Sequence, residues 1–283
     1  MVNIDNITFV ITIYRSEKTI YKCLDSLPKN VKKIILENSK NKNLKFDLER
    51  KYENLKCFLM PENFGYGKAN NYGVKKSLTN YVFILNPDAV FYKNSFNKML
   101  KILANKDFSI AAPLDNLDYK NYQLNRKNTI EVDSVKGFAM LLNKSKMFNQ
   151  YFDENFFLYL EEIDLCKRIK RKKRKIILIN SKIKHLGGLS HGNREDIEME
   201  KSRNWHWMWS NFYYLKKHNS YFLALLKTFP KFVSSLLKYS IYKLLNKSIK
   251  CEIYRLRMHG LISSYCLKKS FYRPYTKSNL RNN

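Results

Sequence analysis

Acidic residues are scarce in this chain of 283 residues, which has 24 Asp and Glu against 53 Lys and Arg and a formal net charge of +29. Such a positive field attracts polyanions, whether nucleic acid, anionic lipid or nucleotide phosphate. The sequence has no RNP-like aromatic strand, zinc finger or recognition-helix signature. Nothing beyond the charge therefore favours nucleic acid as the partner.

Paired cysteines and long apolar runs are also missing. The five cysteines are odd in number, scattered and never spaced as Cys-x-x-Cys, which argues against a disulfide framework and a zinc knuckle and favours a reducing compartment. No run of about 18 uncharged apolar residues predicts a membrane span. The N-terminus shows no basic segment followed by an apolar one, so no signal peptide is expected. We expect a cytoplasmic protein.

Short β-branched runs alternate with helical patterns in the first third of the chain. This alternation predicts an α/β domain with a mainly parallel sheet flanked by helices. The expected strands are Ile7–Tyr14, Val31–Leu36, Cys57–Met60 and Tyr81–Leu85, and the expected helices are Ser16–Leu27 and Asn70–Leu78. Ligands of such sheets lie beyond the carboxyl ends of the strands. We therefore expect a binding site at the polar triplets that follow three strands, Tyr14-Arg15-Ser16, Glu37-Asn38-Ser39 and Asn86-Pro87-Asp88.

The pattern changes in the second half of the chain. We expect strands over Val135–Leu142 and Ile176–Ile179, and between them a helix over Phe156–Lys170 that is acidic at its start. The chain then reads as helices over Trp205–Lys217, over Tyr221–Leu245 with a break at Pro230, and onward to Leu267. This organisation predicts an α/β domain over residues 1–204 and a basic, amphipathic helical extension over residues 205–283.

Two residues are candidates for holding a divalent cation. Asp88 follows a hydrophobic strand, where a carboxylate can hold Mg²⁺ or Mn²⁺ against a diphosphate because hard cations prefer oxygen ligands. His185 also follows a strand and can be a metal ligand or a phosphate contact, with His191 as the alternative ligand. Both have a plainer reading, since Asn-Pro-Asp is a good turn sequence and a single histidine is more often structural.

The segment Asn63–Asn71 carries two glycines, Gly65 and Gly67, on either side of an aromatic residue. Glycines permit close approach of the backbone to a ligand, and the segment opens a helix whose N-terminus favours anions. A glycine-containing loop with a helix cap is the equally good alternative.

Three carboxylates, Glu161, Glu162 and Asp164, are crowded near the start of a predicted helix. Acidic residues there ordinarily offset the helix dipole. Crowding of like charges also raises at least one pKa, which suits a general base. Residues i and i+3 share a helix face, so we expect Glu161 and Asp164 to point together and Glu162 to point elsewhere.

In order and spacing these motifs resemble the family 2 inverting glycosyltransferases, especially bacterial rhamnosyltransferase-like enzymes of polysaccharide assembly. The resemblance runs from Ile7 to His218 and implies a GT-A fold, a nucleoside-diphosphate sugar donor and Mg²⁺ or Mn²⁺ as cofactor. It implies that Asp88 and His185 hold the metal and that Glu162 is the base, with Glu161 and Asp164 as alternatives. The implied donor-binding residues are Tyr14, Ser16, Glu37, Asn38, Asn63, Gly65, Gly67, Asn70, Asn86 and Gly137.

The chain departs from the family pattern where Glu37 and Glu162 replace aspartates and where Asn86 brings no charge. The implied reaction is an in-line displacement, with inversion, that moves a sugar such as rhamnose from a UDP or dTDP donor to a saccharide or polyprenyl-diphosphate-linked acceptor. Two other functions stay open, a nucleic-acid-binding basic protein and a non-catalytic protein that only binds the donor.

The C-terminal part of the chain is basic and amphipathic. Residues 221–283 contain 13 Lys and Arg and a single acidic residue, Glu252. Apolar residues from Phe222 to Leu245 form a broad stripe at helical spacing. Basic amphipathic helices of this kind lie in anionic membrane interfaces, so peripheral binding to the inner membrane face is one expectation. Packing of the stripe onto the α/β domain is the other.

Overall fold

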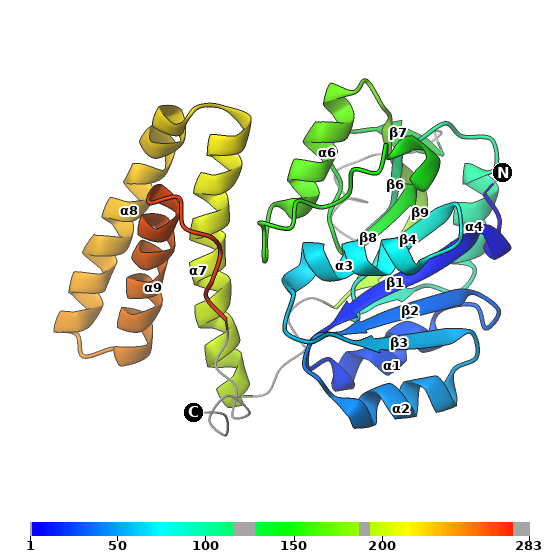
Figure 1. Ribbon diagram of the computed structural model, residues 1–283, viewed down its shortest axis with the longest axis horizontal. Helices are drawn as coiled ribbons and strands as arrows, with labels where there is room; N and C mark the ends of the chain where they lie inside the picture. Colours follow the sequence, from blue (N-terminus) through cyan, green and yellow to red (C-terminus); the bar gives the residue numbers. More distant parts are fainter. Residues whose placement is uncertain (1, 116–127, 187–192, 274–283) are drawn as a thin grey trace. The chain divides into compact units, whose positions relative to one another are not determined.

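The computed structural model describes residues 2–115, 128–186 and 193–273 (Figure 1). The chain divides into two compact units. The first unit consists of Met1–Asp153 and Glu161–Ser190, and the second of Glu154–Leu160 and His191–Asn283. The short piece that precedes Glu161 thus belongs to the second unit, although the residues on both sides of it belong to the first.

The first unit is built on one mixed sheet with the strand order β3-β2-β1-β4-β8-β6-β9-β5, and β7 pairs with β9 (Figure 1). The strands are β1 (Ile7–Ile13), β2 (Lys32–Glu37), β3 (Leu55–Leu59), β4 (Tyr81–Leu85), β5 (Ala89–Phe91), β6 (Ile110–Leu114), β7 (Thr129–Glu131), β8 (Ala139–Asn143) and β9 (Ile176–His185). The expected parallel arrangement holds for β3, β2, β1 and β4. In the other half only β6 and β9 pair in parallel, whereas β8 runs against β4 and β6, and β5 and β7 run against β9. The expectation of a mainly parallel sheet is therefore met only in part.

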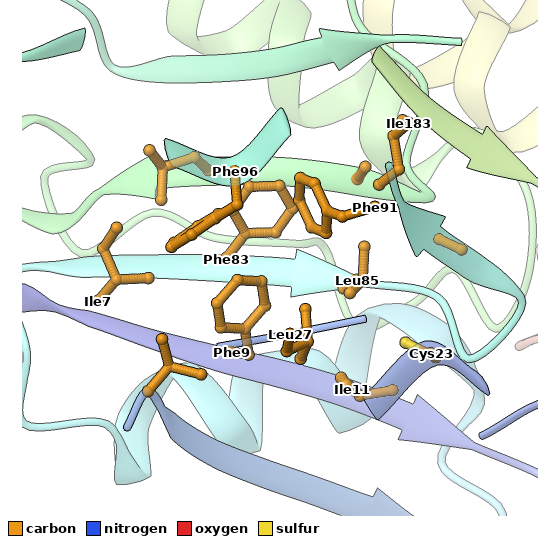
Figure 2. Close-up of a cluster of buried hydrophobic side chains, with 14 of the residues drawn as sticks. Ile7, Phe9, Ile11, Cys23, Leu27, Phe83, Leu85, Phe91, Phe96 and Ile183 are labelled. Atoms are coloured by element: carbon orange, nitrogen blue, oxygen red, sulfur yellow. The ribbon is translucent and has the colours of Figure 1, made fainter. Parts of the chain in front are cut away.

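Helices cover both faces of this sheet, which explains why its central strands are continuous apolar runs. Helices α1 (Glu17–Asp25), α2 (Lys42–Lys51) and α4 (Ser95–Leu103) pack on one face. Helices α3 (Gly65–Lys76) and α6 (Glu161–Arg171) pack on the other. The first face carries a cluster of aromatic rings, in which Phe9 stacks on Phe83 at 5.0 Å and Phe91 lies edge-on to both Phe83 and Phe96 at 5.6 Å (Figure 2).

Several elements of the first unit differ from the sequence-based expectation. Helices α2 and α4 and strands β5, β6 and β7 had no predicted counterpart, and neither had the short 3-10 helices at Ile4–Asn6 and Lys144–Lys146. Helix α3 begins at Gly65 rather than Asn70, and the strand expected over Val135–Leu142 is β8, which begins at Ala139. Helix α6 begins at Glu161 rather than Phe156, because Tyr159 and Leu160 have φ angles of 72° and 68°, which a right-handed helix excludes.

The second unit contains helices α7 (Asn193–His218), α8 (Tyr221–Leu244) and α9 (Ser248–Tyr265). The boundary expected at residue 204 lies inside α7. The break expected at Pro230 is wrong, because α8 continues through it. A proline inside a helix removes one backbone donor, and the packing of α8 against α7 and α9 outweighs that loss. Glycine at position 260 is required, since a Cβ there would lie 2.4 Å from the carbonyl oxygen of Trp205.

A buried histidine joins three segments of the second unit. His206 on α7 is fully buried, and its Nε2 lies 2.7 Å from the carbonyl oxygen of Tyr272 and its Nδ1 3.1 Å from the hydroxyl of Ser270. Figure 1 shows this C-terminal segment, in red, running back along α7. The imidazole also stacks on Phe157, with ring centroids 4.5 Å apart. Burial lowers the pKa of His206 from 6.5 to about 3.

This burial makes the stability of the second unit pH-dependent. Because the folded-state pKa of His206 is lowered, the unfolded chain binds one more proton between pH 6.5 and about 3. The free energy of unfolding therefore falls by about 1.4 kcal/mol per pH unit as the pH drops through this window. We expect His206→Gln to lose this part of the pH dependence. Urea unfolding at pH 7.5 and 5, followed by tryptophan fluorescence, measures it, because all three tryptophans (Trp205, Trp207 and Trp209) lie on α7. An identical pH dependence in both proteins would contradict the prediction.

Candidate active site

The pairing of two strands brings Asp88 and His185 together. Strand β5 runs antiparallel to β9, with Ala89 directly opposite His185, and the amide of Leu186 donates to the carbonyl oxygen of Asp88 at 2.9 Å. This register places Oδ1 of the buried Asp88 side chain 3.3 Å from Nε2 of His185. The two residues are far apart in the sequence, and the structure makes them neighbours as the metal-pair interpretation requires.

The environment of this pair fits a divalent cation. Oδ1 of Asp88 is buried and has no hydrogen-bond partner among the described residues, and Nε2 of His185 lies 3.3 Å from it, so both atoms could bind one ion. Within the same residues no cluster of three His, Cys, Asp or Glu side chains forms. Asp88 and His185 could supply two protein ligands, a number that suits Mg²⁺ or Mn²⁺ because such ions commonly take one or two protein ligands and complete their shell with phosphate and water. The alternative ligand, His191, lies outside the described residues.

The acidic pair at the start of α6 is buried on the same unit. Glu161 is almost fully buried and its Oε2 has no hydrogen-bond partner among the described residues, whereas Glu162 is partly exposed. Burial, and next the charge of Glu162, raise the pKa of Glu161 well above its ordinary value. Burial also raises the pKa of Glu162. Glu161 therefore holds a proton more tightly, and Glu162 is the carboxylate that solvent can reach.

Asp164 is engaged differently from its two neighbours. It is fully buried, and its Oδ2 accepts from Nε of Arg168 at 2.8 Å. The same guanidinium donates to the carbonyl oxygen of Tyr151. As expected from their spacing, Glu161 and Asp164 are the buried members and Glu162 is the more exposed one. Arg168 therefore links the Asp164 carboxylate, within α6, to the segment that precedes the helix.

Two consecutive residues before β8 lie next to both candidate groups, the acidic pair Glu161–Glu162 and the Asp88–His185 pair. Phe138 stacks on the imidazole of His185, with ring centroids 4.3 Å apart. At the preceding position, a Cβ on Gly137 would lie 3.3 Å from Cβ of Glu162, so glycine lets α6 approach this closely. The hydroxyl of Tyr66 on α3 donates to the carbonyl oxygen of Gly137. Glu162 and His185 thus each lie next to one residue of the Gly137–Phe138 dipeptide.

Tyr66 and Phe138 were not assigned roles from the sequence. The signal for Tyr66 was available, because it is the aromatic residue between Gly65 and Gly67. Burial, and next the charges of Glu161 and Glu162, raise the pKa of Tyr66 well above its ordinary value, so it stays a hydrogen-bond donor.

The polar residues after β1 and β2 form connected loops. Ser16 Oγ donates to the carbonyl oxygen of Tyr14 at 3.2 Å, and the amide of Arg15 donates to Ser39 Oγ at 3.3 Å. Glu37 is fully buried, and its carboxylate accepts from the amides of Ser39 at 2.9 Å and Asn41 at 2.6 Å. Glu37 therefore organises its own loop and the start of α2.

The asparagines of the predicted donor site hold the loop that opens α3. Asn38 Nδ2 donates to the carbonyl oxygen of Gly65 at 3.1 Å, and the amide of Gly65 donates to Asn63 Oδ1 at 3.0 Å. Gly65 has a φ of 72°, a conformation that favours glycine. Asn70 is fully buried, and its Nδ2 has no hydrogen-bond partner among the described residues.

Gly67 and Asn86, the remaining predicted donor residues, have neighbours near the acidic pair and at Phe138. A Cβ on Gly67 would lie 3.7 Å from Cβ of Glu161, which places the start of α3 beside the start of α6. The amide of Asn86 donates to the carbonyl oxygen of Phe138 at 2.8 Å. Asn71, which had no assigned role, exchanges two hydrogen bonds with the backbone of Phe152, at 2.8 and 3.0 Å.

Several known proteins are similar to this chain. Over 197 residues it is 25% identical to a low-salt glycan biosynthesis hexosyltransferase from Haloferax volcanii, and the match covers 60% of this chain and 63% of that protein. Over 125 residues it is 27% identical to an uncharacterized glycosyltransferase from Rickettsia typhi, covering 42% of this chain and 39% of that protein. The chain therefore spans less than two thirds of the length of these relatives.

Solved structures of glycosyltransferases share the fold. A mannosyltransferase from Pyrobaculum calidifontis, in complex with GDP-Man and Mn²⁺, superposes with a TM-score of 0.58 at 12% identity and covers 93% of this chain and 88% of its own. GalNAc-T7 with UDP, GalNAc and Mn²⁺ gives a TM-score of 0.56 at 14% identity, covering 72% of this chain and 51% of its own. These likenesses show a GT-A-like glycosyltransferase fold.

The family comparison covers the unit that carries the site. Residues 8–175 match the family described as glycosyl transferase family 2, which is more than half of the chain and includes the acidic pair and Asp88. This protein belongs to glycosyl transferase family 2.

Proposed function

We propose that this protein transfers a hexose, with inversion, from a nucleoside-diphosphate sugar to an acceptor hydroxyl. The observation that carries the proposal is the Gly137–Phe138 dipeptide, which contacts Glu162 on one side and His185 on the other. A proton acceptor and a cation site that flank one dipeptide suit attack on a sugar whose diphosphate is held by the cation. The similar hexosyltransferase and the Mn²⁺-bound neighbours support the same reading.

In the proposed reaction each group has one task. A divalent cation bound by Asp88 and His185 would offset the charge that grows on the departing diphosphate. Glu162 accepts the proton of the acceptor hydroxyl as that oxygen attacks the anomeric carbon, and a single displacement inverts the configuration. Burial raises the pKa of Glu161, which favours its neutral form and so limits negative charge beside Glu162.

The proposed donor is a UDP or dTDP sugar, and rhamnose is one candidate for the sugar. Asn38 and Glu37 would hold the nucleoside, although both carboxylate oxygens of Glu37 already accept from its own loop. The proposed acceptor is a saccharide or a polyprenyl-diphosphate-linked sugar. Tyr14, Ser16 and the loop that opens α3 line the carboxyl ends of the strands where such a donor binds in sheets of this kind.

The cation site predicts a metal-dependent reaction. We expect Asp88→Ala to reduce donor turnover to the level that the unchanged protein shows in EDTA, because the variant loses the one carboxylate of the pair. Asp133→Ala is the matched control, since that side chain is 97% exposed and lies on the same unit. Release of nucleoside diphosphate, measured with Mn²⁺, with Mg²⁺ and with EDTA, tests this. Full metal-dependent turnover by Asp88→Ala would exclude Asp88 as the ligand.

The acidic pair predicts a division of labour. Glu162→Gln should lower kcat by about 10²–10⁴ with little change in donor affinity, because it removes the proton acceptor and keeps the shape. Glu161→Gln should retain most activity, because glutamine resembles the protonated carboxyl. The raised pKa of Glu162 also predicts that kcat/KM of the unchanged enzyme falls with decreasing pH in a limb above pH 4.5. Equal losses in the two variants would move the base away from Glu162.

A further inference from the structure

Helix α8 exposes an apolar face that no described part of the second unit covers. Leu226, Phe229 and Leu237 are 62%, 54% and 59% exposed, and Phe222 and Leu244 at the two ends of the helix are 73% and 83% exposed. These residues recur at intervals of three, four, seven and eight, so they lie on one side of the helix. The opposite side holds the small residues Ala224, Thr228 and Ser235, which are buried. The exposed apolar face is therefore additional to the packing face of α8.

The charges around this apolar face have one sign. No Asp or Glu occurs between Glu200 and Glu252, and α8, the turn after it and the start of α9 carry lysines at positions 227, 231, 238, 243, 247 and 250, of which Lys231 donates to Asn211 on α7. Lys227 and Lys238 are exposed beside the apolar side chains. Long lysine side chains can lie along an apolar surface and keep their ammonium groups in the polar layer above it. Anionic headgroups over an acyl layer match this arrangement of charge and apolarity.

Other occupants fit the charges less well. A second copy of this face would bring lysines against lysines, which is repulsive. The rest of the chain is basic too, since residues 1–190 contain 35 Lys and Arg against 19 Asp and Glu. Among the described residues no helix is long and apolar enough to cross a membrane, so a membrane partner would meet α8 lying in its surface.

We propose that the exposed face of α8 docks this protein on an anionic lipid bilayer, with its apolar side chains below the headgroups and its lysines among the lipid phosphates. This inference does not depend on the proposed reaction, because it concerns only the second unit. It would place an enzyme that uses a lipid-linked acceptor at the surface where that acceptor resides.

Vesicle flotation of the full chain tests the docking. We expect the protein to float with vesicles of phosphatidylcholine mixed with phosphatidylglycerol, to float poorly with phosphatidylcholine alone, and to be released by salt. The double variant Leu226→Gln/Phe229→Gln should weaken binding by about tenfold or more for each side chain. The matched control is Leu78→Gln/Phe46→Gln, which changes one exposed leucine and one exposed phenylalanine of the first unit and should float like the unchanged protein.

A second double variant leaves the apolar side chains of α8 unchanged, so loss of apolar packing cannot explain its result. Lys227→Gln/Lys243→Gln alters exposed ammonium groups of α8, and each substitution should weaken binding to the anionic vesicles by about fivefold. Flotation that is absent for the unchanged protein, or undiminished in both α8 variants, would overturn the proposal. Light scattering identifies the competing occupant, because a dimer that dissociates in Leu226→Gln/Phe229→Gln would mean that a second copy covers the face.

Discussion

The candidate active site depends on a short antiparallel ladder between β5, a strand at the edge of the sheet, and its neighbour β9. Strand β5 has only three residues, yet its register sets Ala89 opposite His185 and so fixes where the Asp88 carboxylate meets the imidazole. A shift of one residue would turn His185 to the other face of the sheet, because side chains alternate along a strand. Phe91 at the end of β5 is buried among Phe9, Phe83 and Phe96, so the aromatic core holds the register.

Burial sets the chemistry of the acidic pair. Two carboxylates beside each other in a buried place cannot both ionise easily, so the pKa of both is raised, and that of the more buried Glu161 is raised well above its ordinary value. The cost of this arrangement is offset nearby, where Asp164 forms an ion pair with Arg168 and Tyr66 donates to the Gly137 carbonyl. The ion pair and the hydrogen bond of these neighbours thus help to hold the two carboxylates in unfavourable surroundings.

The residues of the candidate site could be proposed from the sequence because most of them follow strands whose apolar runs are plain. The amino-acid sequence shows the alternation of strands and helices up to Leu85. It also shows the polar residues that follow these elements, Asp88, His185 and the acidic pair. The features that the sequence did not show are those set by strands that pair although they are far apart in the chain. Strand β5 is too short for a pattern, and the reversed direction of β8 is set by its partners β4 and β6. The start of α6 was misplaced because Tyr159 and Leu160 carry no sign of their left-handed backbone.

The path of the chain links the acidic pair to the helical unit. The chain leaves the first unit after Asp153, passes through seven residues that belong to the second, and returns at Glu161. These seven residues pack on α7, where Ser210 Oγ donates to the carbonyl oxygen of Leu158 at 2.8 Å and Phe156 lies edge-on to Tyr213 at 4.8 Å. Whatever restrains α7 therefore also restrains the backbone up to Leu160, two residues before the proposed base. If α8 rests on a bilayer, the membrane acts on the start of α6 through covalent bonds and the core that α7 and α8 share.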